Sequence, residues 1–393
     1  MKGERKTAPV IRFKGFSDAW EQRKLGELAD IVGGGTPSTL NDEYWNGDID
    51  WYFPAEIDDQ IYVFGSQKKI TQKGLEKSSA KILPVGSVLF TSRAGIGKTA
   101  ILGKEGATNQ GFQSILPYRD TLDSYFIFSL THELKRYGEI TGAGSTFVEV
   151  SGKQLTQMPI LVPNLKEQQK IGTFFKQLDN TIALHQRKLD SLKLMKKGFL
   201  QLMFPKKGEK APKLRFADFP DEWEQRKLKE VSNRYDNLRI PVASSKRIKG
   251  STPYYGANGI QDYVEGFTHE GEFILVAEDG ANDVQNYPVQ YVYGKVWVNN
   301  HAHVLQAKVN ISDNKFLMNT IQVLNIQPFL VGGGRAKLNS DVMMKLPVKL
   351  PIYDEQQKIG TFFKQIDNTI TFYQTKVDKL KIIKRTYLKN MFI

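Results

Sequence analysis

The sequence predicts an α+β fold in which two mixed α/β domains alternate with two long, repeated helices that pair as a coiled coil. Three observations carry this prediction: a block from the middle of the chain recurs near its end, that block has a heptad pattern, and the segments between the repeats are rich in short strands. A chain of 393 residues exceeds one ordinary core, so two domains are expected. The boundaries are placed at 1–160 for the first domain, 161–204 for the first long helix, 205–213 for a linker, 214–350 for the second domain and 351–393 for the second long helix.

The repeat is nearly literal. Residues 167–204 and 355–392 are offset by 188 residues and agree at 24 of 38 positions, which indicates duplication. A second block, IRFKGFSDAWEQRKL at Ile11–Leu25, matches LRFADFPDEWEQRKL at Leu214–Leu228. Residues 29–156 and 232–344 show no comparable similarity to each other. The chain is therefore a duplicated frame that carries two different inserts.

The repeated long block predicts two amphipathic helices with matching apolar seams. Pro163 precedes a capping pattern of Asn164 with Glu167, and the second helix offers Asp354 with Gln357. Prolines and a glycine in Phe204–Pro212 end the first helix and form the linker. The expected seam residues are Ile171, Phe175, Leu178, Ile182, Leu189, Leu192 and Phe199 in the first helix, and Ile359, Phe363, Ile366, Ile370, Val377, Leu380 and Tyr387 in the second.

The two inserts predict short strands joined by polar loops. Ser87–Phe90, Phe273–Val276 and Val289–Tyr293 are apolar runs bounded by Gly, Pro or Asn. The net charge of +13 and pI of about 9.4 favour a polyanionic partner. Glycine amides, Lys and Arg can hold phosphates, and Asn, Gln and Arg can read base edges. The candidate DNA-binding residues are Thr36, Ser38, Arg93, Lys98, Asn109, Gln110, Ser244, Lys246, Arg247, Tyr254, Tyr255, Asn258, Asn299, Asn300, His301, Arg335 and Lys337.

Composition bounds the compartment. Without cysteine the chain can form neither disulfides nor a zinc-thiolate cluster, which fits a cytoplasmic protein. The opening stretch lacks an apolar signal-peptide core, and no apolar run reaches about 18 residues. We therefore expect neither secretion nor a membrane span.

The chain resembles the specificity subunit of type I restriction-modification enzymes over essentially its whole length. The resemblance is carried by the two EQQKIGTFFKQ helices, the two WEQRKL segments, and GGGTPSTLNDEYWNGDIDW at Gly33–Trp51. It implies two target-recognition domains, each reading one half of a bipartite, asymmetric DNA site. It also implies that the repeated helices pack antiparallel as a ruler with pseudo-two-fold symmetry. The expected partners are double-stranded DNA, two methyltransferase subunits that carry S-adenosylmethionine, and motor-nuclease subunits that use ATP and Mg.

Enzyme hypotheses find less support. Ser92 stands where a phosphate-binding P-loop needs its first glycine, and the strand-like Thr99–Leu102 follows instead of a helix. The glycine triplet Gly33–Gly35 is a weak cofactor signal, and Thr252–Tyr255 has one proline where adenine-methylating enzymes have two. We expect no catalytic residue and no cofactor in this chain. The alternative is a DNA-acting enzyme, an adenine methyltransferase or a nucleotide-dependent enzyme, whose motifs are unrecognised.

Metal sites find equally little support in the sequence. His301 and His303 lie on one face of a strand, but no carboxylate or cysteine pattern completes a metal set. Glu278 and Asp279 lack the spaced lysine of a metal-dependent nuclease. The expected metal content is none.

Overall fold

The computed structural model describes residues 8–58, 60–93, 95–142, 149–332 and 336–393. It divides into two compact units, one comprising Met1–His185 with Val377–Ile393, the other Gln186–Lys376. The predicted boundaries set the long helices apart as separate segments, whereas each compact unit includes one part of each helix. Among the described residues, no helix is long and apolar enough to cross a membrane.

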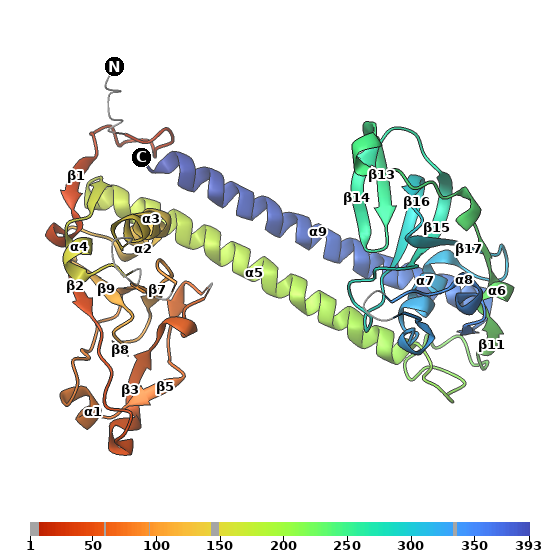
Figure 1. Cartoon of the computed structure of the whole chain (residues 1–393), viewed down its shortest axis with the longest axis horizontal. Coiled ribbons are helices and arrows are strands. Elements are labelled where there is room, and N and C mark those ends of the chain that lie inside the picture. Colours follow the sequence, from red (N-terminus) through yellow and green to blue (C-terminus); the bar gives the residue numbers. More distant parts are fainter. Residues whose placement is uncertain (1–7, 59, 94, 143–148, 333–335) are drawn as a thin grey trace. The chain divides into compact units, whose positions relative to one another are not determined.

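Three small sheets build the first unit (Figure 1). A two-stranded ribbon pairs β1 (Glu21–Lys24) with β10 (Pro159–Val162) in antiparallel register. The largest sheet has the order β2 (Ala29–Gly33), β9 (Gln113–Pro117), β6 (Val88–Phe90), β7 (Thr99–Leu102) and β4 (Tyr62–Val63). The third sheet has the order β5 (Lys68–Ile70), β3 (Trp45–Tyr52) and β8 (Ala107–Thr108).

Short helices cover the first unit's sheets and lead into α5 (Leu165–Met203). They are α1 (Gln72–Glu76), α2 (Ser124–Ser129), α3 (Thr131–Gly142) and α4 (Gly152–Thr156). The main core joins the large sheet to α2 and to the start of α5, through residues such as Phe90, Phe126 and Phe175. The side chain of Asp123 caps α2 by accepting from Phe126 N at 2.8 Å. The backbone N of Asp123 also donates to Gln168 Oε1 at 3.0 Å, which ties the start of α2 to α5.

The second unit repeats the frame around a different sheet. β11 (Glu224–Lys227) pairs with β18 (Pro347–Leu350) as β1 pairs with β10. The six-stranded sheet has the order β12 (Ser232–Arg234), β17 (Ala302–Ala307), β15 (His269–Ala277), β16 (Val289–Val298), β13 (Lys249–Gly256) and β14 (Gly259–Val264). Its helices are α6 (Leu228–Val231), α7 (Asn314–Gln322), α8 (Ser340–Met343) and α9 (Tyr353–Met391). The strands predicted at Phe273–Val276 and Val289–Tyr293 are confirmed within β15 and β16, and the one predicted at Ser87–Phe90 is confirmed as β6, which begins one residue later at Val88.

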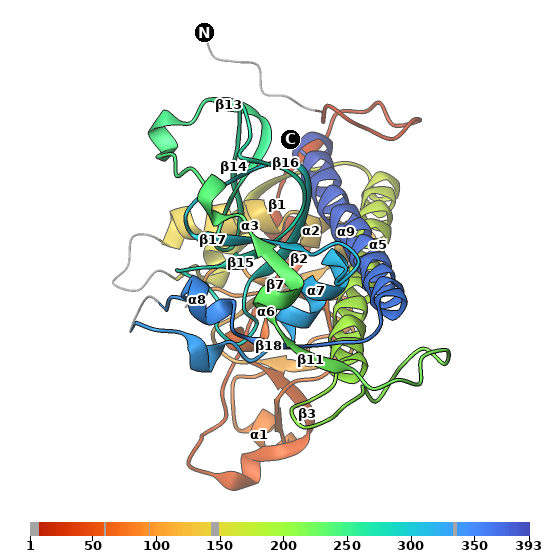
Figure 2. The same ribbon diagram turned by 90° about the vertical axis from the view of Figure 1, so that its right-hand side faces the viewer.

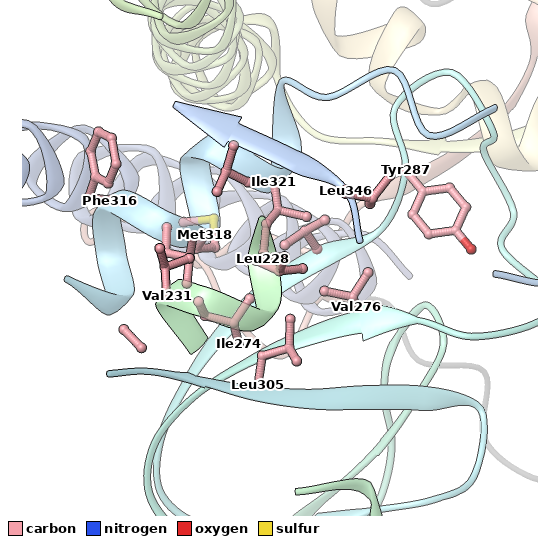
Figure 3. Packing of buried hydrophobic residues seen from close by; sticks show 14 of the residues in the cluster. Leu228, Val231, Ile274, Val276, Tyr287, Leu305, Phe316, Met318, Ile321 and Leu346 are labelled. Atoms are coloured by element: carbon pink, nitrogen blue, oxygen red, sulfur yellow. The ribbon is translucent and has the colours of Figure 1, made fainter. Parts of the chain in front are cut away.

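The core of the second unit lies between this sheet and its helices. Figure 3 shows Leu228 and Val231 of α6 beside Ile274 of β15 and Leu305 of β17, with Ile321 of α7 close by. All five side chains are fully buried. Burying apolar surface at about 25 cal/mol per Å² makes this contact a principal stabilising feature of the unit.

The two long helices run antiparallel within each unit and lie side by side in Figures 1 and 2. In the first unit Lys384 Nζ meets Asp179 at 2.6 Å, and in the second Lys196 Nζ meets Asp367 at 2.7 Å. These are the same two positions of the 188-residue repeat, so duplication has copied the ion pair. Every predicted seam residue is buried or half-buried. A charged position within an apolar seam favours one helix register over others.

The predicted capping residue is confirmed for one long helix and wrong for the other. Asn164 caps α5 by accepting from Glu167 N at 3.0 Å. α9 begins at Tyr353, so Asp354 lies inside its first turn rather than at its cap. The cap position carries Ile352, which is the repeat equivalent of Asn164 and offers no side-chain acceptor. The end of α5 at Met203, just before the predicted linker, is confirmed.

Candidate nucleic-acid interface

Four of the six predicted residues of the first unit meet at one loop cluster. The Thr36 hydroxyl donates to Gln110 Oε1, which ties the loop after β2 to the loop after β8. The two loops approach so closely that a Cβ on Gly34 would lie 2.0 Å from Asn109 O. Only glycine fits there. The glycine run that the sequence singled out thus serves backbone packing between two polar loops.

Ser92 joins a third loop to this cluster. Its backbone N and its hydroxyl both donate to Gly111 O, at 2.8 and 3.1 Å. Asn109 Oδ1 accepts from Gly111 N at 2.8 Å, so the same glycine is held from two sides. Arg93 follows Ser92 and is half-buried. The sequence alone did not mark Ser92 as a structural anchor, because a serine between polar neighbours carries no burial signal.

The other two predicted residues of the first unit stand outside the cluster. Lys98 ends the turn between β6 and β7, where its Nζ lies 3.9 Å from Asp58. Its successor strand β7 confirms that no P-loop helix follows. Ser38 is exposed, and its carbonyl accepts from Trp45 Nε1 at 3.1 Å. Neither side chain forms a hydrogen bond to the cluster within the described ranges.

In the second unit, polar side chains gather at the end of β15. Asn258 Nδ2 donates to Gly280 O at 2.9 Å, and its Oδ1 accepts from Asn282 N at 3.0 Å. His301 Nδ1 lies 2.5 Å from an oxygen of Asp279. These three contacts hold the 279–282 loop beside Asn258 and His301, which the sequence predicted to bind DNA.

A network of charged groups lies beneath that loop. The Glu278 carboxylate forms ion pairs with Arg239 Nη1 at 2.7 Å and with Lys337 Nζ at 2.9 Å. The His303 ring is fully buried; its Nδ1 contacts Asp236 at 2.7 Å and its Nε2 contacts the carbonyl of Leu338 at 2.8 Å. Both ring nitrogens therefore lie within hydrogen-bonding distance of an oxygen.

This network corrects two expectations from the sequence. The fold brings Asp236 and Glu278 to His303, so that ligand-type atoms of all three lie within 4.8 Å of one another. The fold also pairs Glu278 with Lys337, a lysine that the spacing of residues along the sequence did not reveal. The carboxylates and cations come from segments distant in sequence, which no local pattern can show. Arg239 and Lys337 pair with the carboxylates of this group, which therefore form an ion-pair network.

The electrostatics of the two carboxylates agree with this interpretation. Burial acts to raise the pKa of Asp236, but the hydrogen bond and charge of His303, with Arg239, outweigh it and lower the pKa. For Glu278 burial is likewise outweighed by hydrogen bonds from Arg239 and Lys337, and its pKa is lowered. Both groups therefore remain ionised and paired.

Several predicted residues of the second unit lie inside the fold. Tyr254 is 1% exposed, its hydroxyl accepts from Val242 N at 2.9 Å, and the Arg247 guanidinium lies 4.1 Å from its ring centre. Asn299 is also buried, and its Oδ1 accepts from His301 N at 2.8 Å. The prediction that Tyr254 and Asn299 present their side chains to DNA is therefore wrong, because neither reaches the surface of this structure.

The remaining predicted residues are placed as follows. Ser244, Lys246, Asn258, Asn300 and Lys337 are exposed, while Arg247, Tyr255 and His301 are half-buried. Arg335 lies outside the described residues. The structure thus gathers Asn258, His301 and Lys337 around one loop and leaves Ser244 and Lys246 on a separate short turn.

Comparison with known proteins decides the family. The family model described as "Type I restriction modification DNA specificity domain" matches residues 17–194 and 220–381, which together exceed half of the chain. The chain belongs to this family. Its two matched stretches cover both inserts and most of both long helices, so both halves of the duplicated frame are family domains.

Individual proteins that resemble this chain agree with the family match. A Methanocaldococcus jannaschii type I restriction enzyme specificity subunit is 29% identical over 317 residues, which span 74% of this chain and 73% of the relative. A Haemophilus influenzae chain, provisionally named a specificity subunit, is 48% identical over 138 residues, 35% of this chain and 36% of its own length. A crystal structure of a type I restriction-modification S subunit from M. genitalium has a TM-score of 0.71 at 15% identity and covers 98% of this chain and 99% of that one. The last match shows the shared fold. By family this chain is a type I restriction-modification specificity subunit.

Proposed function

We propose that each unit reads one half of a bipartite, asymmetric DNA target. The observation that carries the proposal is one frame, copied in both units, that holds two unrelated sheets. The ribbons β1–β10 and β11–β18 have the same register, and both lead into a long helix. Because the two inserts differ while the frame is the same, each insert recognises a different DNA sequence. The loop cluster around Asn109 and Gln110, and the loop held by Asn258 and His301, are the proposed reading surfaces.

The test is methylome sequencing of a host that expresses this chain with its methyltransferase subunit. We expect one methylated motif made of two defined half-sites that differ in sequence and flank an unspecified spacer. Exchanging residues 232–344 for the second insert of another family member should change one half-site only. A motif with one continuous site, or a change in both halves after the exchange, contradicts independent reading.

We propose that two copies of one partner, a methyltransferase subunit, dock on the long helices outside their seam. Each unit exposes the same three apolar positions of the repeat. In the first unit these are Leu184, Ile382 and Ile383, and in the second Phe372, Leu194 and Met195, all between 42% and 71% exposed. Repeated apolar positions at a surface favour a repeated partner.

Charge substitution tests the docking. Leu194→Glu should remove one methyltransferase subunit from the assembly, and Leu194→Glu with Ile382→Glu should remove both. Native mass spectrometry counts the subunits. The control is Leu40→Glu, since Leu40 is 96% exposed and lies on a loop of the first unit. Retention of both subunits by the double variant would refute this surface.

We also propose that the chain performs no chemistry, and that S-adenosylmethionine, ATP and Mg bind to partner subunits. The ion-pair network of Asp236, Glu278 and His303 supports this, because its polar atoms are engaged with Arg239 and Lys337. The alternative is a DNA-acting enzyme. Calorimetry on the isolated chain separates the two, since the enzyme hypothesis requires binding of S-adenosylmethionine or ATP.

A further inference from the structure

A cavity of about 280 Å³ lies in the second unit between α5, α7, α9 and β16. Lysines from three different helices line it: Lys196, Lys315 and Lys364. Lys196 pairs with Asp367 at 2.7 Å. Lys315 and Lys364 have no carboxylate within 4 Å among the residues that the structure describes. Neither ammonium group therefore forms a direct ion pair within the described part of the chain, although the charge of Lys315 acts on Asp313, where it opposes the rise in the pKa of that carboxyl that burial causes.

These two ammonium groups converge on one aromatic ring. The Nζ of Lys315 lies 5.9 Å, and that of Lys364 4.9 Å, from the ring centre of Tyr291. Both lysines are half-buried. Two like charges that share a partly desolvated site repel each other, and an anion between them would relieve the repulsion.

Two amide oxygens that line the same cavity lack donors. Asn319 is fully buried, and its Nδ2 donates to Lys315 O at 2.7 Å, which fixes the orientation of its amide. Asn319 Oδ1 and Gln322 Oε1 are buried and have no hydrogen-bond partner in the structure. A buried acceptor without a donor costs free energy, and both residues line this cavity.

The first unit fills the corresponding place with aromatic side chains. Lys176 is the repeat equivalent of Lys364, and Tyr125 occupies the position of Lys315, two residues after the capping aspartate of α2. Tyr125 OH donates to Asp179 at 2.8 Å, and its ring packs 6.2 Å from Tyr62 and 5.4 Å from Phe128. The second unit has a cationic cavity where the first has an aromatic cluster.

We propose that the cavity of the second unit binds a phosphate group, with its oxygens between Lys315 and Lys364. Asn319 Oδ1 and Gln322 Oε1 then accept from hydroxyl or amino groups of the same molecule, as a nucleotide or sugar phosphate would supply. A DNA backbone phosphate has the same anionic chemistry without those donors. The site is separate from the loops proposed to read bases, and it does not depend on that proposal.

The experiment uses the full chain and the double variant Lys315→Gln/Lys364→Gln, with Lys176→Gln as the matched control from the first unit. Calorimetric titration with inorganic phosphate and with AMP, in the absence of DNA, measures the affinity of the protein for each free ligand. We expect binding by the wild type and by the control, and at least a tenfold weaker affinity in the double variant. The thermal unfolding midpoint of each protein shows whether it is folded. If the double variant is unfolded, the single variant Lys364→Gln replaces it in the titrations.

A second arm measures DNA affinity against salt concentration. If the phosphate belongs to DNA, neither free ligand binds, and the slope of log K against log salt falls by about one for each lysine removed. Binding of a free ligand that the double variant loses supports the proposal with a small-molecule source, and the altered slope supports it with DNA as the source. The proposal is overturned if phosphate and AMP fail to bind and the slope stays unchanged.

Discussion

Glu167 holds the guanidinium of Arg12 with both carboxylate oxygens, at 2.7 Å each. Glu355 and Arg215 repeat the arrangement in the second unit, at 2.8 and 2.7 Å. Both carboxylates are completely buried, and both arginines come from the short segment ahead of the WEQRKL strand. The bidentate pair thus closes each unit by joining its first segment to the first turn of its long helix.

Removing one partner of this pair should destabilise the unit that contains it. Glu355→Ala leaves the Arg215 guanidinium largely buried without its counter-charge, and the expected cost is about 3 kcal/mol. Urea unfolding followed by tryptophan fluorescence measures the change. Glu222→Ala is the control, because Glu222 pairs with Lys210 at an exposed position and should change stability little. Equal effects of the two variants would contradict a closing role for the buried pair.

Glycines of the long helices give a second prediction. A Cβ on Gly360 would lie 2.6 Å from Asp313 Oδ1, and Asp313 cannot move aside without releasing the cap of α7 at Phe316 N. Gly360→Ala should therefore destabilise the second unit by about 1–3 kcal/mol. Gly198 lies in α5, and a Cβ added there would meet nothing within 4 Å, so Gly198→Ala should stabilise by about 0.5–1 kcal/mol. Differential scanning calorimetry of the two variants should show midpoint shifts of opposite sign.

Histidine 269 makes stability depend on pH. Burial disfavours its charged ring and lowers the pKa of His269, against the opposing hydrogen bond to the Tyr235 carbonyl. In the unfolded chain the ring titrates near its ordinary pKa of 6.5. The neutral His269 ring therefore contributes its full stabilisation to the free energy of unfolding above that pH. This stabilisation is lost as the pH falls, by at most about 1.4 kcal/mol per pH unit. His269→Gln should flatten the loss of unfolding free energy between about pH 6.5 and 5. Parallel curves for the variant and the wild type would show that His269 does not titrate on unfolding.

The sequence predicts the frame of this protein well because the frame is duplicated. The WEQRKL strand and the apolar seam each appear twice, and each copy supports the other. The repeat register also marks Ile352 as the equivalent of Asn164, which a local capping pattern at Asp354 obscured. Periodicity and repetition are properties of the chain itself, so they can be found without coordinates.

The candidate site is predicted less well, because its partners are distant in sequence. Asp236, Glu278 and His303 meet only when β15 and β17 pair, and their spacing follows no motif. The sequence predicts Tyr254 in a polar loop, but it belongs to β13 and turns into the core, where it packs near Arg247 and Trp297. Residue type indicates that an aromatic or amide side chain can read a base, but only the fold decides which of them reaches the surface.

Arg93 provides the test of the first reading surface. It follows Ser92, which is anchored to Gly111, so its backbone is held beside the loop that carries Asn109 and Gln110. Arg93→Ala should weaken binding of the cognate DNA by about 1–3 kcal/mol if the side chain reads a guanine, and specificity should relax at one base pair of the first half-site. Fluorescence anisotropy with every single-base variant of that half-site measures both effects. Arg119→Ala is the control, since Arg119 is exposed on the turn after β9. Uniform weakening on all sequences would assign Arg93 to a phosphate instead.

The last prediction concerns the long helices as the determinant of half-site spacing. α5 and α9 each have 39 residues, and each contributes one part to each unit. Seven residues inserted after His185 and seven after Lys376 preserve the heptad seam and add about 10.5 Å of helix at about 1.5 Å per residue. At about 3.4 Å per base pair, the preferred spacer should lengthen by about three base pairs, with both half-sites unchanged. Three base pairs also turn one half-site by about 100° around the duplex, so the protein or the DNA must twist, and affinity should fall. Methylation of a plasmid library that carries both half-sites at every spacing measures the result. An insertion in α5 alone breaks the match between the seams and should abolish methylation, whereas an unchanged spacer in the assembled double insertion would show that the helices do not set the distance.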